Sequence, residues 1–288
     1  MAVLVTRLAA FAATACMAGS LAFAEPPKPG QKPRHIVSMN QCTDQLLMLL
    51  VEPKRIASIS FVTHQPQWTP PEMKAAVAKL DANHALAEEI LPMKPDLVVT
   101  GTYTGRNTVT LLRRLGYQVV EFEPEYTFDQ IRSNIRKMGV AVGEPGRADQ
   151  IVAAFDARLA AIKAKGAAPK GVFADVGVNG WMAGDGTLMA EAANAAGYRT
   201  LGQALGFSGF RYVSLEQIVA AAPDAIAPSN AWVDPPSQAT NALRHPALKR
   251  LMATSANVTI PERLLVCGSP YVLDAAEILA NAQKPSAQ

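Results

Sequence analysis

Short apolar runs rich in β-branched residues alternate along the chain with amphipathic, helix-like patterns. In the first half they predict strands at 35–39, 55–60, 96–100 and 118–122, with candidate helices at 43–51, 86–93 and 108–115. In the second half they predict strands at 171–176, 224–227, 258–260 and 264–267. Strands that alternate with helices favour parallel sheets covered by helices. The pattern therefore predicts an α/β protein.

Helical periodicity runs unbroken from a Gly-Glu-Pro-Gly break at 143–146 to about Lys165. About 20 residues at 1.5 Å each give a length of roughly 30 Å, the width of a small domain. We therefore expect a linking helix within 143–167 that joins an N-terminal lobe (25–142) to a C-terminal lobe (168–288). Its apolar stripe is formed by Ile151, Phe155, Leu159 and Ile162, spaced four, four and three apart.

The two halves share a sequence element. Residues 88–96 and 216–224 both read Glu-x-Ile-x4-Pro-Asp, and each element leads directly into an aliphatic strand. Pro-Asp before a strand is common, but the spacing of all four shared positions is identical. Two similar lobes on either side of a long helix account for this repetition better than chance.

The first 24 residues differ in composition from the rest. They carry one charge, Arg7, then an apolar stretch at 8–23 that ends in Ala22-Phe23-Ala24. A small-x-small ending is typical of a signal-peptidase site. A membrane anchor needs about 20 continuous apolar residues, and this stretch is shorter. We expect residues 1–24 to be a signal peptide that exports the protein to the periplasm.

Composition excludes several classes of protein. A chain of 288 residues with 49% hydrophobic and 18% charged residues is not intrinsically disordered. A net charge of +3 provides no basic excess for a nucleic-acid backbone. Three cysteines are too few for a disulfide scaffold or a multi-cysteine zinc module.

Sequence motifs of catalysis are absent. The chain has no G-x-S-x-G, no H-E-x-x-H, no Walker loop and no G-x-G-x-x-G after a strand. Its four histidines are dispersed, and this favours binding without catalysis and without a cofactor. His64 and His84, in loops beside strands, leave open direct binding of a transition-metal ion. Ser60 near His64 leaves open a periplasmic hydrolase, as a weaker alternative.

An ordered set of segments resembles a known family. The segments are 36–40 with 43–47, 55–59, the repeated element with its strand at 88–99, and 214–218. They resemble the periplasmic substrate-binding proteins of ABC importers for ferric siderophores, haem and cobalamin, over about residues 34–282. The resemblance implies two Rossmann-like lobes joined by one rigid helix. It also implies a monomer that carries a metal chelate between the lobes to a permease dimer at the inner membrane.

The resemblance also implies a role for the repeated glutamates. In the family, one glutamate on each lobe docks onto arginines of the two permease subunits, and the motif places these at Glu88 and Glu216. A glutamate in the first turn of a helix is also stabilised by the helix dipole. Because a two-fold permease presents two equivalent surfaces, the matched pair favours docking.

In open α/β sheets, ligands bind at the carboxyl ends of the strands, so we expect the loops there to form the cleft. Aromatic side chains in those loops indicate a large ligand with a planar or apolar face. Arg106 and Arg211 could pair with ligand carboxylates or catecholate oxygens. A ferric siderophore therefore ranks first, then cobalamin, then haem. The candidate ligand-binding residues are Met39, Asn40, Phe61, His64, His84, Tyr103, Arg106, Trp181, Met182, Phe210, Arg211, Tyr212, Trp232 and Tyr271.

Removal of the signal peptide leaves two cysteines. Cys42 opens the first predicted helix and Cys267 ends a predicted late strand, and both are expected at the mouth of the cleft. A disulfide between them would tie the two lobes together. It requires Cα atoms within about 7 Å, which the sequence does not define, so free thiols remain the alternative.

Overall fold

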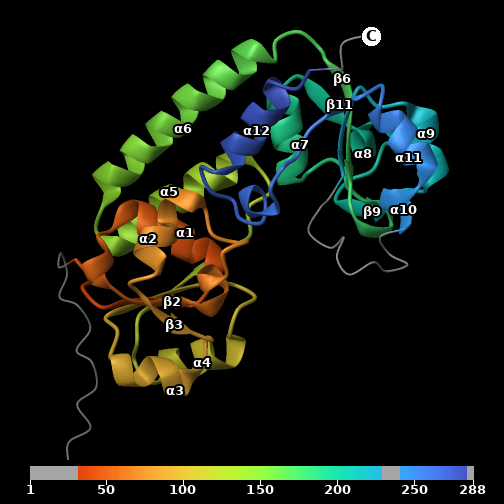
Figure 1. Cartoon of the computed structure of the whole chain (residues 1–288). Coiled ribbons are helices and arrows are strands. Elements are labelled where there is room, and N and C mark those ends of the chain that lie inside the picture. Colours follow the sequence, from red (N-terminus) through yellow and green to blue (C-terminus); the bar gives the residue numbers. More distant parts are fainter. Residues whose placement is uncertain (1–31, 229–240, 284–288) are drawn as a thin grey trace, which may run out of the picture.

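Two α/β lobes flank one long helix, α6 (Pro145–Lys165), which crosses from one lobe to the other (Figure 1). The structure is a computed structural model that describes residues 32–228 and 241–283. The predicted signal peptide (1–24) and Trp232 lie outside the described residues. The expected fold class is confirmed, whereas the exact lobe boundaries at 25–142, 143–167 and 168–288 remain predictions.

The N-terminal lobe contains a five-stranded parallel sheet in the order β3-β2-β1-β4-β5. Successive residues point to opposite faces of a strand, so Val37 and Val98 pack under α3 and α4, while Ile36 and Leu97 pack under α1 and α5. Its elements are β1 (Ile36–Ser38), α1 (Gln41–Leu50), η1 (Pro53–Arg55), β2 (Ile56–Ser60), η2 (Phe61–His64), η3 (Pro71–Met73), α2 (Lys74–Val77), β3 (Asp81–Asn83), α3 (Ala87–Ile90), η4 (Leu91–Met93), β4 (Leu97–Gly101), α4 (Arg106–Arg114), β5 (Val119–Phe122) and α5 (Phe128–Val142).

The C-terminal lobe contains a four-stranded parallel sheet, β11-β10-β6-β8, and a separate antiparallel ribbon of β7 and β9. Helices again cover both faces of the parallel sheet, α7 and α12 on one and α8, α9 and α11 on the other. Its elements are β6 (Gly171–Val176), η5 (Val178–Gly180), β7 (Trp181–Ala183), α7 (Leu188–Ala195), β8 (Tyr198–Thr200), α8 (Leu201–Ala204), β9 (Phe210–Tyr212), α9 (Leu215–Ala221), β10 (Ala225–Pro228), α10 (Asn241–Arg244), α11 (Pro246–Met252), β11 (Ala256–Asn257), η7 (Glu262–Leu264) and α12 (Val272–Ala280).

Two predicted strands near the C-terminus are wrong. The strand expected at 258–260 is instead β11 at 256–257, and the strand expected at 264–267 is a turn followed by an irregular segment. The reason is that this segment leaves the sheet and crosses to the N-terminal lobe. There Ser269 donates its hydroxyl to Gln45 Oε1 at 2.8 Å, so no sheet strand lies beside it to pair with.

The repeated sequence element is also a repeated structure. In both copies the isoleucine is buried (Ile90 and Ile218), and the residue before Pro-Asp adopts a left-handed conformation, at Lys94 (φ 47°) and Ala222 (φ 43°). In the first copy, the aspartate of Pro-Asp, Asp96, accepts the backbone N–H groups of Arg34 and His35 at 2.6 and 3.0 Å. In the second copy, Asp224 accepts the N–H of Val172 at 2.9 Å. The spacing is fixed because each aspartate must reach the beginning of the first strand of its lobe.

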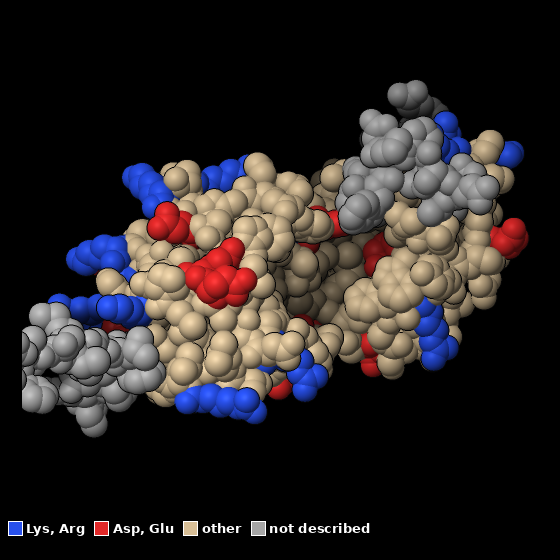
Figure 2. Space-filling model, turned by 90° about the horizontal axis from the view of Figure 1, so that it is seen from below, with Lys and Arg blue, Asp and Glu red and all other residues tan. Residues whose placement is uncertain are grey.

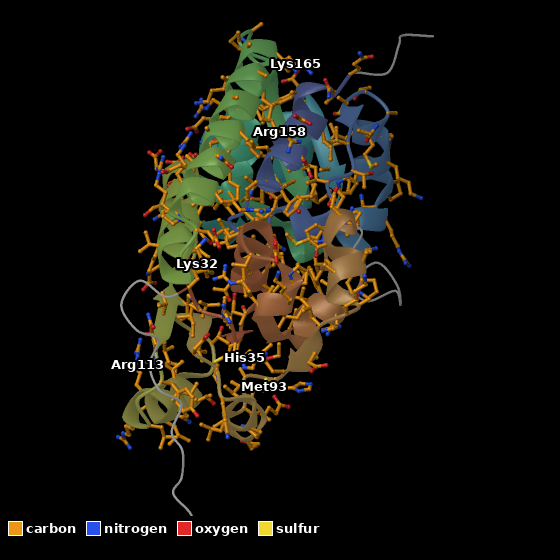
Figure 3. All side chains as sticks on the ribbon, turned by 90° about the vertical axis from the view of Figure 1, so that its left-hand side faces the viewer. Lys32, His35, Met93, Arg113, Arg158 and Lys165 are labelled. Atoms are coloured by element: carbon orange, nitrogen blue, oxygen red, sulfur yellow. A yellow bond between two sulfur atoms is a disulfide. The ribbon has the colours of Figure 1, made fainter. Side chains whose placement is uncertain are left out.

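Helix α6 packs along its length against both lobes. The predicted stripe is largely confirmed: Phe155, Leu159 and Ile162 are buried, but Ile151 is only half-buried and Val152 takes its place in the core. The buried face of α6 belongs to one continuous apolar core that includes residues of both sheets. In the second half of the helix, Arg158, labelled in Figure 3, forms ion pairs with two carboxylates of α12, Asp274 and Glu277.

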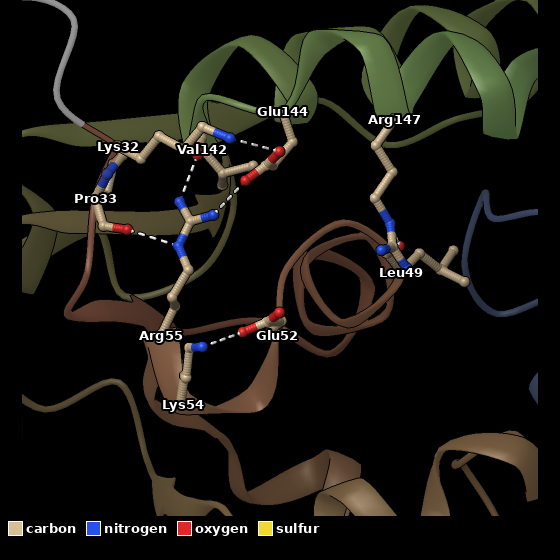
Figure 4. Close-up of polar contacts among 9 residues, drawn as sticks. All are labelled: Lys32, Pro33, Leu49, Glu52, Lys54, Arg55, Val142, Glu144 and Arg147. Atoms are coloured by element: carbon tan, nitrogen blue, oxygen red, sulfur yellow. Dashed lines mark hydrogen bonds and ion pairs between the residues drawn. The ribbon is translucent and has the colours of Figure 1, made fainter.

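The beginning of α6 is fixed to the N-terminal lobe by Arg55, the residue that precedes β2. Its guanidinium donates to the backbone carbonyls of Pro33 and Val142, and it forms an ion pair with Glu144 at 2.6 Å (Figure 4). Lys32 pairs with the same carboxylate at 2.9 Å, and together the two cations hold the pKa of Glu144 below its usual value. Since Glu144 is the residue before the helix, this network sets the direction in which α6 leaves the lobe.

Candidate ligand-binding site

A cavity of about 900 Å³ lies between the two lobes, visible in Figure 2 as the central hollow. The N-terminal lobe contributes the segments that follow β1, β4 and β5, together with Trp68. The C-terminal lobe contributes the segment that follows β6, the end of β10, one face of the β7–β9 ribbon, the start of α7 and part of the crossing segment 260–268. The volume is within the range of pockets that bind cofactors and other small molecules.

Sheet topology explains which loops of the N-terminal lobe reach this cavity. The strand order reverses between β1 and β4, and the carboxyl ends of strands at such a switch point form a natural crevice. Strands β2 and β3 lie on the outer side of β1, so the loops that follow them are farther from the crevice. As a result, Phe61, His64 and His84 are not part of the cavity lining.

The C-terminal wall of the cavity is a set of aromatic rings on the β7–β9 ribbon. Trp181 is stacked with Phe210, with a centroid separation of 5.7 Å and an interplanar angle of 4°. The ring of Tyr212 lies 4.8 Å from Trp181, directly across the ribbon. All three side chains are exposed, at 42%, 47% and 67% respectively. Large rings that stack on one another but remain uncovered are suited to contact with a flat apolar face.

The N-terminal wall combines small polar side chains with the separate aromatic residues Trp68, Tyr103, Phe122 and Tyr126. Asn40 caps α1 by accepting the N–H of Cys42 at 2.8 Å, and its amide donates to Thr104 Oγ1 at 2.9 Å. A Cβ at Gly101 would lie 3.2 Å from that amide, so a glycine here allows β4 to approach closely. Tyr103, at 77% exposure, is an uncovered aromatic side chain of this wall.

The charged residues of the lining are all acidic. They are Glu123, Glu125, Asp175 and Glu262, and no Lys or Arg of the described ranges lines the cavity. Burial raises the pKa of Asp175 to about 8, against a lowering by the hydrogen bond from Ala183 N–H. Burial also raises the pKa of Glu125, which accepts a hydrogen bond from Asn134. The described lining therefore offers acidic groups and no cation, beside a wall of aromatic rings.

Five of the predicted ligand-binding residues line the cavity: Asn40, Tyr103, Trp181, Phe210 and Tyr212. The aromatic residues of the C-terminal lobe lie on strands, and not in loops as predicted. Because side chains alternate along a strand, Met182 and Arg211 point to the other face of the ribbon, where Met182 is buried and Arg211 stacks on Phe207.

The remaining predicted residues lie elsewhere. Met39 is buried in the core beneath α3 and α4, and Arg106 begins α4 outside the lining. Tyr271 precedes α12 and packs against the main core. The two predicted arginines are therefore not brought together across the cavity.

The two histidines of the metal-ion alternative belong to separate environments. His84 stacks on Phe61 at 4.6 Å and its Nδ1 lies 2.8 Å from Glu89 Oε1. His64 Nε2 is buried and has no hydrogen-bond partner among the described residues. No group of three or more His, Cys, Asp and Glu side chains suited to a metal ion occurs within residues 32–228 and 241–283. Ser60, the nucleophile of the hydrolase alternative, is buried and caps η2 by accepting the N–H of Val62.

Cys42 and Cys267 form a disulfide, with Cα atoms 5.1 Å apart. The bond joins the start of α1 in the N-terminal lobe to the crossing segment of the C-terminal lobe, and Cys42 lines the cavity. Beside it, a Cβ at Gly268 would lie 2.2 Å from the Cβ of Glu125, so only glycine permits this approach. The disulfide and α6 are thus two separate connections between the lobes.

Sequence reasoning missed several residues of the cavity. Asp175 is the one acidic residue in an otherwise apolar strand, and that contrast indicates a functional position. Trp68 gave no signal, because it reaches the lining from a turn region between η2 and η3. Glu123 and Glu125 follow β5 directly, and the strand-end argument that identified Asn40 and Tyr103 applies to them equally.

Glu88 and Glu216 are both exposed, and both are the second residue of a helix, α3 and α9 respectively. They occupy equivalent places in the repeated element, one on each lobe. Glu89, the neighbour of Glu88, is instead engaged with His84. This placement is compatible with docking of Glu88 and Glu216 to a partner, which remains a prediction.

The fold and the inter-lobe cavity agree with comparisons to known proteins. A family described as "Periplasmic binding protein" matches residues 36–257. The chain belongs to this family. Comparison with curated proteins gives no match. No helix in the described part of this family member is long and apolar enough to cross a membrane.

Solved structures of periplasmic binding proteins share the fold. A periplasmic heme-binding protein from Pseudomonas aeruginosa is 22% identical, with a TM-score of 0.66 over 88% of this chain and 95% of that protein. An ABC-type Fe3+-hydroxamate transport protein from Saccharomonospora viridis is 18% identical, with a TM-score of 0.64 over 86% and 92%. The vitamin B12 binding protein BtuF of Vibrio cholerae is 19% identical, with a TM-score of 0.63 over 86% and 96%. At these identities the likeness concerns the fold.

Proposed function

We propose that this periplasmic binding protein captures a metal chelate between its lobes and delivers it, as a monomer in the periplasm, to an ABC importer. The observation that carries the proposal is the cavity of about 900 Å³ with the stacked rings of Trp181 and Phe210 on one wall. No catalytic step is part of the proposal. The related structures include proteins named for heme, Fe3+-hydroxamate and vitamin B12, and these define the range of ligands to test.

The charge of the lining changes the ranking of ligands. The sequence favoured an anionic chelate because of Arg106 and Arg211, but neither side chain is part of the lining. Haem carries two negatively charged propionates. A lining that offers carboxyl groups and no cation disfavours it. We therefore rank ferric hydroxamates and cobalamin ahead of ferric catecholates and haem.

Glu88 and Glu216 are the proposed contacts with the two permease subunits. Both are exposed, and the repeated element gives each lobe one of them in an equivalent position. Exposed carboxylates can form ion pairs with arginines of a partner without a large desolvation cost in the free protein. Their symmetry in the fold matches the two-fold symmetry expected of a permease dimer.

The proposal is tested by titrating the tryptophan fluorescence of the mature protein. The panel consists of a hydroxamate and a catecholate ferric siderophore, cobalamin, haemin and zinc chloride. We expect saturable quenching by one chelate at about micromolar concentration or below, since Trp68 and Trp181 line the cavity. A response to zinc alone would support the metal-ion alternative, and no response to any chelate would reject the proposal.

A further inference from the structure

We propose that the cavity selects a metal chelate carrying an ammonium or another cationic N–H group, and that Asp175 is the residue that accepts it. This inference rests on the proposed function and specifies the charge of the ligand. It concerns a specificity-determining contact, made by a side chain that lies at the carboxyl end of β6 and forms part of the cavity lining.

The first observation is the unpaired oxygen of Asp175. Its Oδ2 accepts the backbone N–H of Ala183 at 3.0 Å, whereas Oδ1 is buried and has no hydrogen-bond partner among the described residues. A buried acceptor without a donor is unfavourable, and such a group in a binding cavity is satisfied when a ligand supplies the donor. In the unliganded protein, Asp175 Oδ1 therefore lacks a hydrogen-bond donor among the described residues.

The second observation is that no described protein cation is placed to donate to the unpaired oxygen of Asp175. The chain has 27 Lys and Arg residues, but none of those described lines the cavity. The other charged groups around the cavity are the carboxylates of Glu123, Glu125 and Glu262. An anionic ligand would meet carboxyl groups and no cation among the described lining residues, whereas a cationic ligand would be the complementary partner.

The third observation is the aromatic wall. The rings of Trp181, Phe210 and Tyr212 present exposed faces to the cavity, and the face of an aromatic ring attracts cations. Hydrogen bonds between an ionised carboxylate and a charged donor are about twice as strong as neutral ones. A chelate with an apolar body and a cationic N–H group would satisfy both the rings and Asp175.

Two ferric hydroxamates that differ in one group test the inference. Ferrioxamine B carries a free ammonium, and its N-acetyl derivative has the same iron centre but no charge on that arm. By isothermal titration calorimetry we expect the wild-type protein to bind the ammonium form at least about tenfold more tightly. A ferric tricatecholate, which is a trianion, should bind more weakly than either.

Asp175→Asn should remove the preference, so that the two hydroxamates bind within about threefold of each other. Its amide oxygen can still accept the Ala183 N–H, and thermal unfolding checks that the variant is folded. Glu52→Gln is the charge-matched control, because Glu52 is exposed, pairs with Lys54 and lies outside the cavity. This control should keep the full preference.

Equal binding of the two hydroxamates by the wild-type protein would overturn the inference without recourse to any variant. A preference that survives in Asp175→Asn would also overturn the role of this residue. Tight binding of the tricatecholate alone would reject the inference but leave the proposed function standing. Failure of every chelate to bind would reject the proposed function itself, and the inference with it.

Discussion

In the N-terminal lobe the wall of the cavity combines hydrogen-bonded small polar side chains with separate aromatic residues such as Trp68 and Tyr103, whereas in the C-terminal lobe three aromatic rings are grouped on one ribbon. Yet both lobes contain the same element, in which a helix, a left-handed residue and Pro-Asp lead into a strand. The repeated part lies in the scaffold and the differing part lies at the cavity. The ribbon of β7 and β9, which has no counterpart in the N-terminal lobe, provides most of the difference.

The equivalence of the two lobes at their outer surfaces is tested by the double variant Glu88→Ala, Glu216→Ala. We expect it to abolish import of the chelate in cells while its affinity for the chelate stays unchanged, because both side chains are exposed outside the cavity. Uptake of radiolabelled chelate and calorimetry measure the two properties. The control is Glu52→Ala with Asp185→Ala, two exposed carboxylates on the same two lobes. Normal uptake by the first double variant would exclude the docking role.

The covalent link between the unlike walls is tested by Cys42→Ser with Cys267→Ser. We expect the free energy of unfolding to fall by about 2–4 kcal/mol, since the bond closes a very long loop. Urea denaturation with and without a reducing agent measures the loss. The reductant should destabilise the wild-type protein and leave the double variant unaffected. Equal stability of the two proteins under oxidising conditions would contradict the expectation.

The difference between the walls is tested by Trp181→Ala and Tyr103→Ala. We expect Trp181→Ala to weaken chelate binding by about 2 kcal/mol, because it removes the central ring of the stack. Tyr103→Ala, on the N-terminal wall, should weaken the binding free energy by about half as much. Trp181→Phe, which keeps an aromatic face, is the matched control and should retain most of the affinity measured by calorimetry. If Tyr103→Ala weakened binding more than Trp181→Ala, the N-terminal wall would contribute more to binding than the aromatic ribbon.

The shared scaffold is tested by Asp96→Ala and Asp224→Ala. Each change removes a carboxylate that accepts the backbone N–H groups at the start of β1 or β6, and each should cost about 1–2 kcal/mol of unfolding free energy. Asp81→Ala, an exposed residue of β3, should change stability by less than about 0.5 kcal/mol. If only one of the two variants lost stability, the aspartate would stabilise one copy of the element and not the other.

The smallest expected effect is a proton released on binding. Burial raises the pKa of Asp175 to about 8, so near neutral pH the unliganded carboxyl is mainly protonated. A ligand ammonium favours the carboxylate and lowers this pKa, so affinity for ferrioxamine B should rise with pH up to about 8 and then level off. Calorimetry in two buffers with different ionisation enthalpies counts the proton. Asp175→Asn should release none from this site, and an unchanged proton count would show that Asp175 is not the source of the proton.

Much of the fold was predictable because it depends on local patterns. The apolar strands of both sheets, the stripe on α6 and the repeated element could all be recognised in the sequence. The antiparallel ribbon could not, because β7 and β9 are three residues each and are separated by 26 residues of chain, so their pairing depends on long-range packing. The crossing segment at 260–268 was misassigned because residues 264–267 have the composition of a strand but no neighbouring strand among the described residues.

The candidate site was predictable only in part, for the same reason. Asn40 and Tyr103 follow strands at the switch point, and the strand-end rule identifies them. The rule also selected Phe61 and His84, which lie outside the cavity lining. Their exclusion depends on the order of strands in the sheet, and local sequence patterns do not determine that order. Likewise, Arg211 faces away from Trp181 only because of the register of the ribbon.

The disulfide turns the chain between Cys42 and Cys267 into a macrocycle that passes through both sheets. Thiols are kept reduced in the cytosol and are oxidised in the periplasm. For a protein exported to the periplasm, we therefore expect the ring to close after export. Protein made in the cytosol would lack the disulfide, and α6 would be the only covalent connection between its described lobes, so an oxidising step belongs in its preparation.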